Sequence, residues 1–167
     1  MAAEKILVVD DEPHIRQALQ AALESDGYLV LCAENGKDGV EKCKTFKPAL
    51  AILDVRMPVM DGHMASIEIK YDDTLKDTKI IFLTANTDDD SRNYGLGHGA
   101  EMYLLKPFNV DDLLSRVGAL LRPHLGGAAA APQAPAAPAA PAPKAAPIDD
   151  KARAAYLENL KKKLGGK

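Results

Sequence analysis

The chain has 167 residues, of which 47% are hydrophobic and 27% charged, the balance of a soluble globular protein of about one domain. Its aromatic content is only 5%, it has no tryptophan, and no apolar run reaches ~20 residues, which argues against a stacking surface for single-stranded nucleic acid and against a transmembrane helix. The formal net charge of −3 combines −7 over residues 1–125 with +4 over residues 126–167, and such an acidic body argues against direct binding to nucleic acid.

Strand-like apolar runs alternate with helical patterns through residues 1–125. In chain order the pattern predicts a strand at 5–9, a helix from Pro13 that is stopped by Gly27, a strand at 28–33, a helix at 36–46, a strand at 49–53, a helix at 63–71, a strand at 79–83, a weak helix at 88–98, a strand at 102–105 and a helix at 110–121. Near-continuously apolar strands between helices indicate a parallel sheet that is covered on both faces. We therefore predict an α/β fold: a flavodoxin-like, doubly wound sheet of five parallel strands, (βα)5, with strand order 2-1-3-4-5.

Cys32 and Cys43 lie in the second predicted strand and the second predicted helix. Their spacing fits neither a metal site nor a disulfide framework, so we interpret both as small buried apolar side chains. Because the N-terminus also lacks the pattern of a signal peptide, we expect a cytoplasmic protein without a membrane role.

The chain divides into three predicted parts: a domain at 1–125, a linker at 126–147 and a tail at 148–167. Twelve of the 22 residues at 126–147 are Ala and six are Pro, which predicts a flexible, semi-extended linker. In the tail, Ala152, Tyr156, Leu160 and Leu164 recur every four positions, and three lysines lie near the end, which is typical of a short amphipathic helix. Because ~15 residues make a marginal helix in water, we expect the tail to fold against a partner protein or against the acidic residues 1–125. The alternatives are a disordered basic tail and a helix that lies on a membrane surface.

Polar side chains stand where the predicted strands end. Asp10 and Asp11 follow the first strand, Asp54 the third, Thr84 the fourth and Lys106 the fifth. Taken singly, an Asp in such a place is usually a helix cap, Thr84 a turn residue and Lys106 a solvated charge. Ligands of such sheets, however, bind beyond the carboxyl ends of the strands, where all five side chains would converge. Carboxylates gathered there suit Mg²⁺, and Asp54 is the expected nucleophile for a phosphoryl group, with Lys106 and Thr84 as cation and hydroxyl donor.

Four motifs together resemble a response-regulator receiver domain of two-component signalling, similar to the single-domain chemotaxis (CheY-like) type. They are Val8-Val9-Asp10-Asp11-Glu12, Leu53-Asp54-Val55-Arg56-Met57-Pro58-Val59-Met60-Asp61-Gly62, Leu83-Thr84-Ala85-Asn86 and Tyr103-Leu104-Leu105-Lys106-Pro107-Phe108. The resemblance covers residues 4–122, and the combination of motifs is highly specific.

The resemblance implies that Asp54 accepts a phosphoryl group from a phosphohistidine of a sensor kinase. It implies that Asp11, Asp54 and the backbone carbonyl of Arg56 bind Mg²⁺ directly, while Asp10 acts through water. Arg56 and Asn86 each follow a site residue by two positions, and we expect their side chains to tune the lifetime of the phosphoryl group.

The same resemblance implies that Thr84 and Lys106 contact the phosphoryl oxygens and that the Lys106–Pro107 peptide bond is cis. It also implies that Tyr103 is a switch residue, which turns inward as Thr84 moves toward the phosphate. The alternative for Tyr103 is an ordinary aromatic side chain at the edge of the sheet.

The predicted helix at 88–98 and the segment after it hold Gly95, Gly97 and Gly99. Interior glycines cost up to ~1 kcal/mol each of helix propensity, so one hypothesis is a mobile, easily remodelled signalling face. The other is that Gly97 and Gly99 only end the helix.

The sequence thus predicts a phosphorylation-operated switch of protein interactions that catalyses only its own phosphorylation and dephosphorylation. Expected partners are a sensor histidine kinase or phosphotransfer protein, a target on the face of the fourth helix, fifth strand and fifth helix or on the tail, and a second copy after phosphorylation. No helix-turn-helix follows the domain, which argues against direct transcriptional control. The alternatives are a phosphate sink or a constitutive scaffold.

Two other families fit the sequence less well. A haloacid-dehalogenase-like phosphatase needs a second Asp two residues after the nucleophile, where this chain has Arg56. A flavin-binding flavodoxin needs a phosphate-binding loop rich in Gly, Ser and Thr after the first strand, and the chain has none.

Overall fold

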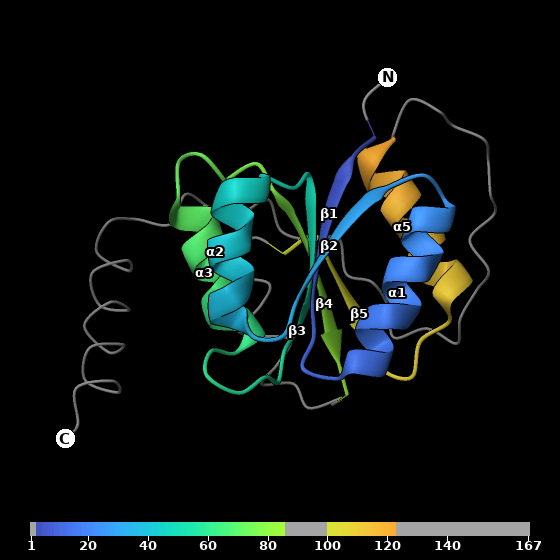
Figure 1. The fold of residues 1–167 in the computed structure, drawn as a ribbon, viewed down its shortest axis with the longest axis horizontal. Coiled ribbons are helices and arrows are strands. Elements are labelled where there is room, and N and C mark those ends of the chain that lie inside the picture. Colours follow the sequence, from blue (N-terminus) through green and yellow to red (C-terminus); the bar gives the residue numbers. More distant parts are fainter. Residues whose placement is uncertain (1–2, 86–99, 123–167) are drawn as a thin grey trace.

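The computed structural model describes residues 3–85 and 100–122 (Figure 1). In chain order the elements are β1 (Lys5–Val9), α1 (Pro13–Ser25), β2 (Leu29–Ala33), α2 (Gly36–Phe46), β3 (Leu50–Asp54), α3 (Gly62–Tyr71), β4 (Lys79–Thr84), β5 (Met102–Leu105) and α5 (Val110–Leu121). The five strands form one parallel sheet in the order β2-β1-β3-β4-β5. The predicted fold class and strand order are confirmed.

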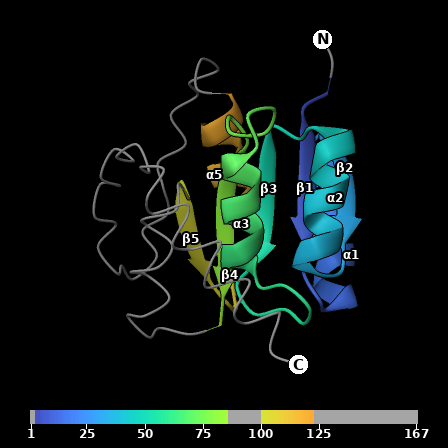
Figure 2. The same ribbon diagram turned by 90° about the vertical axis from the view of Figure 1, so that its left-hand side faces the viewer.

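Two pairs of helices cover the sheet. Helices α1 and α5 lie on one face and α2 and α3 on the other (Figures 1 and 2). Each strand supplies side chains to both faces: in β1, Leu7 and Val9 pack in the cluster under α2 and α3, whereas Ile6 and Val8 pack in the cluster under α1 and α5. This double burial explains why the strands are apolar without alternation.

Side chains fix where the helices begin. Pro13 occupies the first turn of α1, where its missing N–H costs nothing. Asn35, Asp61 and Asn109 cap α2, α3 and α5, each by accepting a hydrogen bond from a backbone N–H of the first turn. Helices α2 and α5 begin within a few residues of the carboxyl ends of β2 and β5, at the sheet edge that carries the predicted site.

The predicted boundaries differ from the observed ones by one residue at several points. Strands β3 and β4 include Asp54 and Thr84 as their last residues, so both are strand residues and do not follow the strands. Cys43 is buried as predicted, whereas Cys32 is half-buried.

Other predictions fall outside the described residues. These are the helix at 88–98 with its glycines, Asn86, the linker at 126–147 and the tail at 148–167. Among the helices that are described, none is both long and apolar enough to cross a membrane.

Candidate functional site

The carboxyl edge of the sheet gathers the polar residues that the sequence singled out. Asp10 directly follows β1, and Asp54 and Thr84 end the neighbouring strands β3 and β4. Thr84 pairs in register with Leu105, so the next residue, Lys106, leaves β5 at the same edge. Parallel pairing of β1, β3, β4 and β5 therefore brings these side chains to one place.

Lys106 connects three carboxylates. Its Nζ lies 2.9 Å from Asp10 Oδ2, 3.3 Å from Asp54 Oδ2 and 3.4 Å from Glu12 Oε1. The Asp10 side chain is fully buried, and those of Lys106 and Asp54 are only 12% and 7% exposed. Solvent therefore screens the charges of Lys106, Asp10 and Asp54 weakly, so the attraction of the two carboxylates to Lys106 and their repulsion of each other are strong.

Backbone groups hold the two buried carboxylates in place. The N–H of Glu12 donates to Asp10 Oδ1 at 2.9 Å, and the N–H of Arg56 donates to Asp54 Oδ1 at 3.3 Å. Arg16 Nη1 donates to the Asp10 carbonyl oxygen at 2.5 Å, which ties the first turns of α1 to the end of β1. The other carboxylate oxygen of each residue is thereby directed to Lys106.

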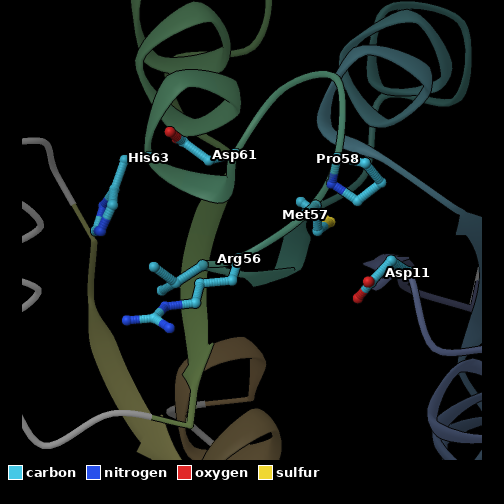
Figure 3. Close-up of a pocket in the computed structure, with 7 residues that line it drawn as sticks. Asp11, Arg56, Met57, Pro58, Asp61 and His63 are labelled. Carbon is cyan, nitrogen blue, oxygen red and sulfur yellow. The ribbon is translucent and has the colours of Figure 1, made fainter.

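The loop from β3 to α3 closes tightly against the site. The Gly62 N–H donates to Val55 O at 3.1 Å, and a Cβ at Gly62 would lie 2.1 Å from Asp54 O. Only glycine permits this approach of the helix to the strand. The loop lines a depression with Asp11 on one side and with Arg56, Asp61 and His63 on the other (Figure 3).

Burial and charge act in opposite directions on the site's pKa values. Burial, together with the negative charge of Asp10, raises the pKa of Asp54 from 3.8 to about 6, although Lys106 and the Arg56 N–H oppose the shift. Burial by itself would lower the pKa of Lys106, but the hydrogen bond and charge of Asp10, with those of Asp54, raise it overall. At neutral pH Lys106 is therefore an ammonium ion and Asp54 is mostly ionised.

The acidic residues fit a divalent cation. Carboxylate oxygens of Asp10, Asp11 and Glu12 all lie within 4.8 Å of one another, and Asp54 joins them through Lys106. Hard oxygen ligands of this kind suit Mg²⁺. Lys106 is one ammonium ion among the carboxylates of Asp10, Glu12 and Asp54, which also favours a cation.

Tyr103 lies beside the site on β5. Its ring stacks on Phe82 with centroids 5.1 Å apart, and Phe82 in turn contacts the His63 ring at 4.8 Å. The Tyr103 hydroxyl is buried and has no hydrogen-bond partner among the described residues, and burial raises its pKa. The structure thus shows an aromatic side chain that packs into the core. The Lys106–Pro107 peptide bond is cis, as the resemblance implied.

The structure brings Asp10, Asp54, Thr84 and Lys106 together, with Asp11 exposed at the rim. Their functional roles remain predictions, and Asn86 lies outside the described residues. Sequence reasoning missed Glu12, whose carboxylate reaches Lys106. Its position directly after Asp10 and Asp11 was the available signal.

Arg56 was expected to act on the phosphoryl group through its side chain and on Mg²⁺ through its carbonyl. Its side chain is exposed and extends away from Asp11 (Figure 3). His63 was not singled out by the sequence, yet it lines the same depression and contacts the Phe82 ring.

Comparison with known proteins matches the family model of the response regulator receiver domain to residues 6–118. The probable transcriptional regulator ycf27 of Porphyridium aerugineum is 39% identical over 122 residues, which are 73% of this chain and 50% of the relative. Chemotaxis protein CheY4 of Vibrio cholerae has a solved structure that is 34% identical, with a TM-score of 0.69, over 72% of this chain and all of that one.

A third match is the response regulator TrrA of Thermotoga maritima, solved in complex with Mg²⁺ and BeF. It is 40% identical, with a TM-score of 0.64, over 71% of this chain and 99% of TrrA. The chain spans about half the length of the curated relatives that it matches first, whereas it covers the solved receiver structures almost completely.

Proposed function

Because the chain belongs to the response regulator receiver family, we propose that it accepts a phosphoryl group on Asp54 and relays the signal by changing its contacts with other proteins. The observation that carries this proposal is the Lys106 ammonium, which lies between the buried carboxylates of Asp10 and Asp54. Such an arrangement places a nucleophilic carboxylate beside a fixed positive charge, as phosphoryl transfer requires.

In the proposed reaction, a carboxylate oxygen of Asp54 attacks the phosphorus of a phosphohistidine. The O–P bond forms, the N–P bond breaks, and the imidazole leaves with its electron pair and takes up a proton. With a pKa of about 6, Asp54 is mostly ionised at neutral pH and can attack without a separate base. Lys106 would stabilise the negative charge on the phosphoryl oxygens.

The family binds Mg²⁺ at its acidic site, and we propose the same for this chain. Asp11, Asp54 and the backbone carbonyl of Arg56 would hold the ion, and Asp10 would act through water. When bound, Mg²⁺ would offset the negative charge of the carboxylates and the incoming phosphoryl group.

Thr84 and Tyr103 are the proposed switch. Thr84 would donate its hydroxyl to a phosphoryl oxygen, and Tyr103 would respond to its displacement. Their strands are paired in register, Phe82 with Tyr103 and Thr84 with Leu105, which supports a direct route between them.

Receiver domains work with histidine kinases, so a histidine kinase or phosphotransfer protein is the proposed phosphodonor. For the output we propose protein contacts in the cytoplasm, without an enzymatic activity on other substrates. The acidic charge of residues 1–125 supports a target other than DNA. The ycf27 relative is titled a transcriptional regulator and CheY4 a chemotaxis protein, so both kinds of output occur among proteins similar to this one.

The test is phosphorylation of the full chain by radiolabelled acetyl phosphate with Mg²⁺. We expect one phosphoryl group per chain, released by hydroxylamine as an acyl phosphate is, and none on Asp54→Asn. Asp73→Asn is the matched control, because its carboxylate is 98% exposed and belongs to no site. Labelling of Asp54→Asn at the wild-type level would contradict the proposal.

A second experiment tests the switch itself. Full-length chain is used to capture partners with and without beryllofluoride and Mg²⁺, where beryllofluoride stands in for the phosphoryl group on Asp54. A partner retained only by the beryllofluoride form supports the switch. The same partners in both forms would favour a phosphate sink or a constitutive scaffold.

A further inference from the structure

Three rings form a row on the sheet face that α2 and α3 cover. Phe82 of β4 and Tyr103 of β5 are paired in register and pack in the same cluster, with their ring centroids 5.1 Å apart. The His63 ring of α3 lies 4.8 Å from that of Phe82, at 52° to it. Both distances are those at which aromatic rings attract one another. Phe82 therefore joins a helix residue to the proposed switch residue.

The row is anchored firmly at its His63 end. His63 is the second residue of α3, and the Gly62 N–H before it donates to Val55 O at 3.1 Å. Asp61 caps the turn from which His63 projects (Figure 3). Because the Gly62 backbone packs directly against the carbonyl oxygen of Asp54, the position of His63 is fixed relative to the strand end that carries the proposed phosphoacceptor.

The other end of the row depends on ring packing. Phe82 is fully buried in the core. The Tyr103 hydroxyl is buried as well, yet it has no hydrogen-bond partner within residues 3–85 and 100–122. Burying a hydroxyl without a partner costs free energy, so within this part of the chain it is the packing of its ring that keeps Tyr103 inside. A contact that holds the Phe82 ring in place therefore supports the buried position of Tyr103.

We propose that His63 is a positioning residue for the switch: its ring holds Phe82 against Tyr103 and thereby keeps the Tyr103 hydroxyl buried. The inference rests on the proposed function for the role of Tyr103 and adds a residue that acts on it. Since α3 begins against Asp54, the row of rings connects the phosphoacceptor to Tyr103 by side-chain packing. This connection is separate from the one proposed through the Thr84 hydroxyl.

The test measures how often the Tyr103 hydroxyl is exposed. The full-length chain is treated briefly with N-acetylimidazole, which acetylates the hydroxyl of an exposed tyrosine, and the acetylated tyrosines are located by peptide mass spectrometry. The rate at a buried tyrosine is proportional to the fraction of molecules in which it is exposed. Tyr28 is the internal reference, because its hydroxyl is also buried but lies in the cluster under α1 and α5, on the opposite face of the sheet.

Three variants isolate the contribution of the His63 ring. His63→Ala removes the ring, His63→Phe replaces it with another ring, and Glu68→Ala truncates an exposed side chain of the same helix. For His63→Ala we expect acetylation of Tyr103 to be about 3- to 10-fold faster than in the wild type, as the loss of one aromatic contact implies. In His63→Phe and Glu68→Ala, Tyr103 reacts at the wild-type rate. Tyr28 does so in every variant.

Three results would overturn the inference: a wild-type rate at Tyr103 in His63→Ala, an equal rise at Tyr28 in that variant, or a rise in His63→Phe as large as in His63→Ala. A repeat with beryllofluoride and Mg²⁺ tests the proposed function separately. If the switch operates, beryllofluoride slows acetylation of Tyr103 in the wild-type chain. An unchanged rate would contradict the switch, whereas the three results above concern the ring contact, so the two failures are distinguishable.

Discussion

The two ends of the sheet satisfy their polar groups in different ways. At the amino end, the Thr78 hydroxyl donates to Pro48 O at 3.0 Å, and the Lys79 N–H donates to Ala49 O at 2.9 Å. Lys70 Nζ donates a hydrogen bond to the Thr78 carbonyl oxygen at 2.7 Å. Each of these three groups therefore meets a partner of opposite polarity, which stabilises the amino end.

At the carboxyl end, like charges face one another. Asp10 and Asp54 are both buried, share one ammonium ion, and leave Asp54 with a raised pKa. The comparison shows where buried charges of the same sign gather. Hydroxyl and backbone groups pair with one another at the amino end, whereas two buried carboxylates share one ammonium ion at the end where the proposed reaction occurs.

The largest effect is expected for Gly62→Ala at the carboxyl end. Its new Cβ would lie 2.1 Å from the backbone oxygen of Asp54, which cannot move without displacing β3. We expect the free energy of unfolding to fall by at least about 4 kcal/mol, measured by urea denaturation. Gly118→Ala is the control, because its Cβ would meet only Tyr28 Oη, at 4.0 Å, and alanine favours the helix. Equal stabilities of the two variants would show that the close approach is not required.

Lys106→Met tests the charges at the carboxyl end directly. Removing the ammonium leaves Asp10 and Asp54 buried without their counter-charge, so we expect a loss of about 3 kcal/mol in the presence of a chelator. Added Mg²⁺ should stabilise this variant more than the wild type, as read from the midpoint of thermal unfolding. Lys76→Met, which breaks an exposed ion pair with Asp73, should cost less than about 1 kcal/mol. A similar small loss for Lys106→Met would contradict the buried-charge account.

Asp54→Asn should stabilise the chelated protein at neutral pH. The pKa of Asp54 is higher in the folded chain, about 6, than its ordinary 3.8, so the folded state binds the proton more tightly. The resulting stability is fully present below about pH 4 and is lost as pH rises through about 6. The asparagine variant lacks this loss, and we expect it to exceed the wild type by about 2–3 kcal/mol at pH 8 and to match it near pH 4. A pH-independent difference would rule out this origin.

The smallest effect is expected at the amino end, for Thr78→Val. The substitution keeps the shape of the side chain and removes one hydrogen bond to Pro48 O, which should cost about 1 kcal/mol. The loss should be the same at pH 5 and pH 8 in urea denaturation, because no titrating group is involved. A pH-dependent loss would mean that the two ends of the sheet are electrostatically coupled.

Most of the fold could be predicted from the sequence because burial on both faces leaves unbroken apolar runs, such as Ile6 to Val9. The ends of the strands were harder to predict from the sequence. A pattern rule ends a strand at the first polar residue, but pairing in the sheet is a backbone property, and Asp54 pairs with Leu83 as regularly as the apolar residues before it.

The site could be predicted as far as parallel strands dictate it, since Asp10, Asp54, Thr84 and Lys106 all lie at one edge. The sequence could not predict which carboxylate forms the shortest ion pair with Lys106. Whether Lys106 approaches Asp10 or Asp54 more closely, and whether Glu12 joins them, depends on side-chain conformations in the first turn of α1. Likewise, no apolar pattern reveals the positive φ of Val59. This residue lies in the loop from β3 to α3, which the Gly36 N–H of α2 holds through Met60 O.

The position of β5 in the sheet has a mechanical consequence. It is a strand of four residues, and within residues 3–85 and 100–122 it pairs only with β4. Tyr103 lies within it and Lys106 directly after it, so one short segment carries both the aromatic side chain and the ammonium ion. We therefore expect a displacement of Lys106 to reach Tyr103 through this one strand, and to reach β4 through the stacking of Tyr103 on Phe82.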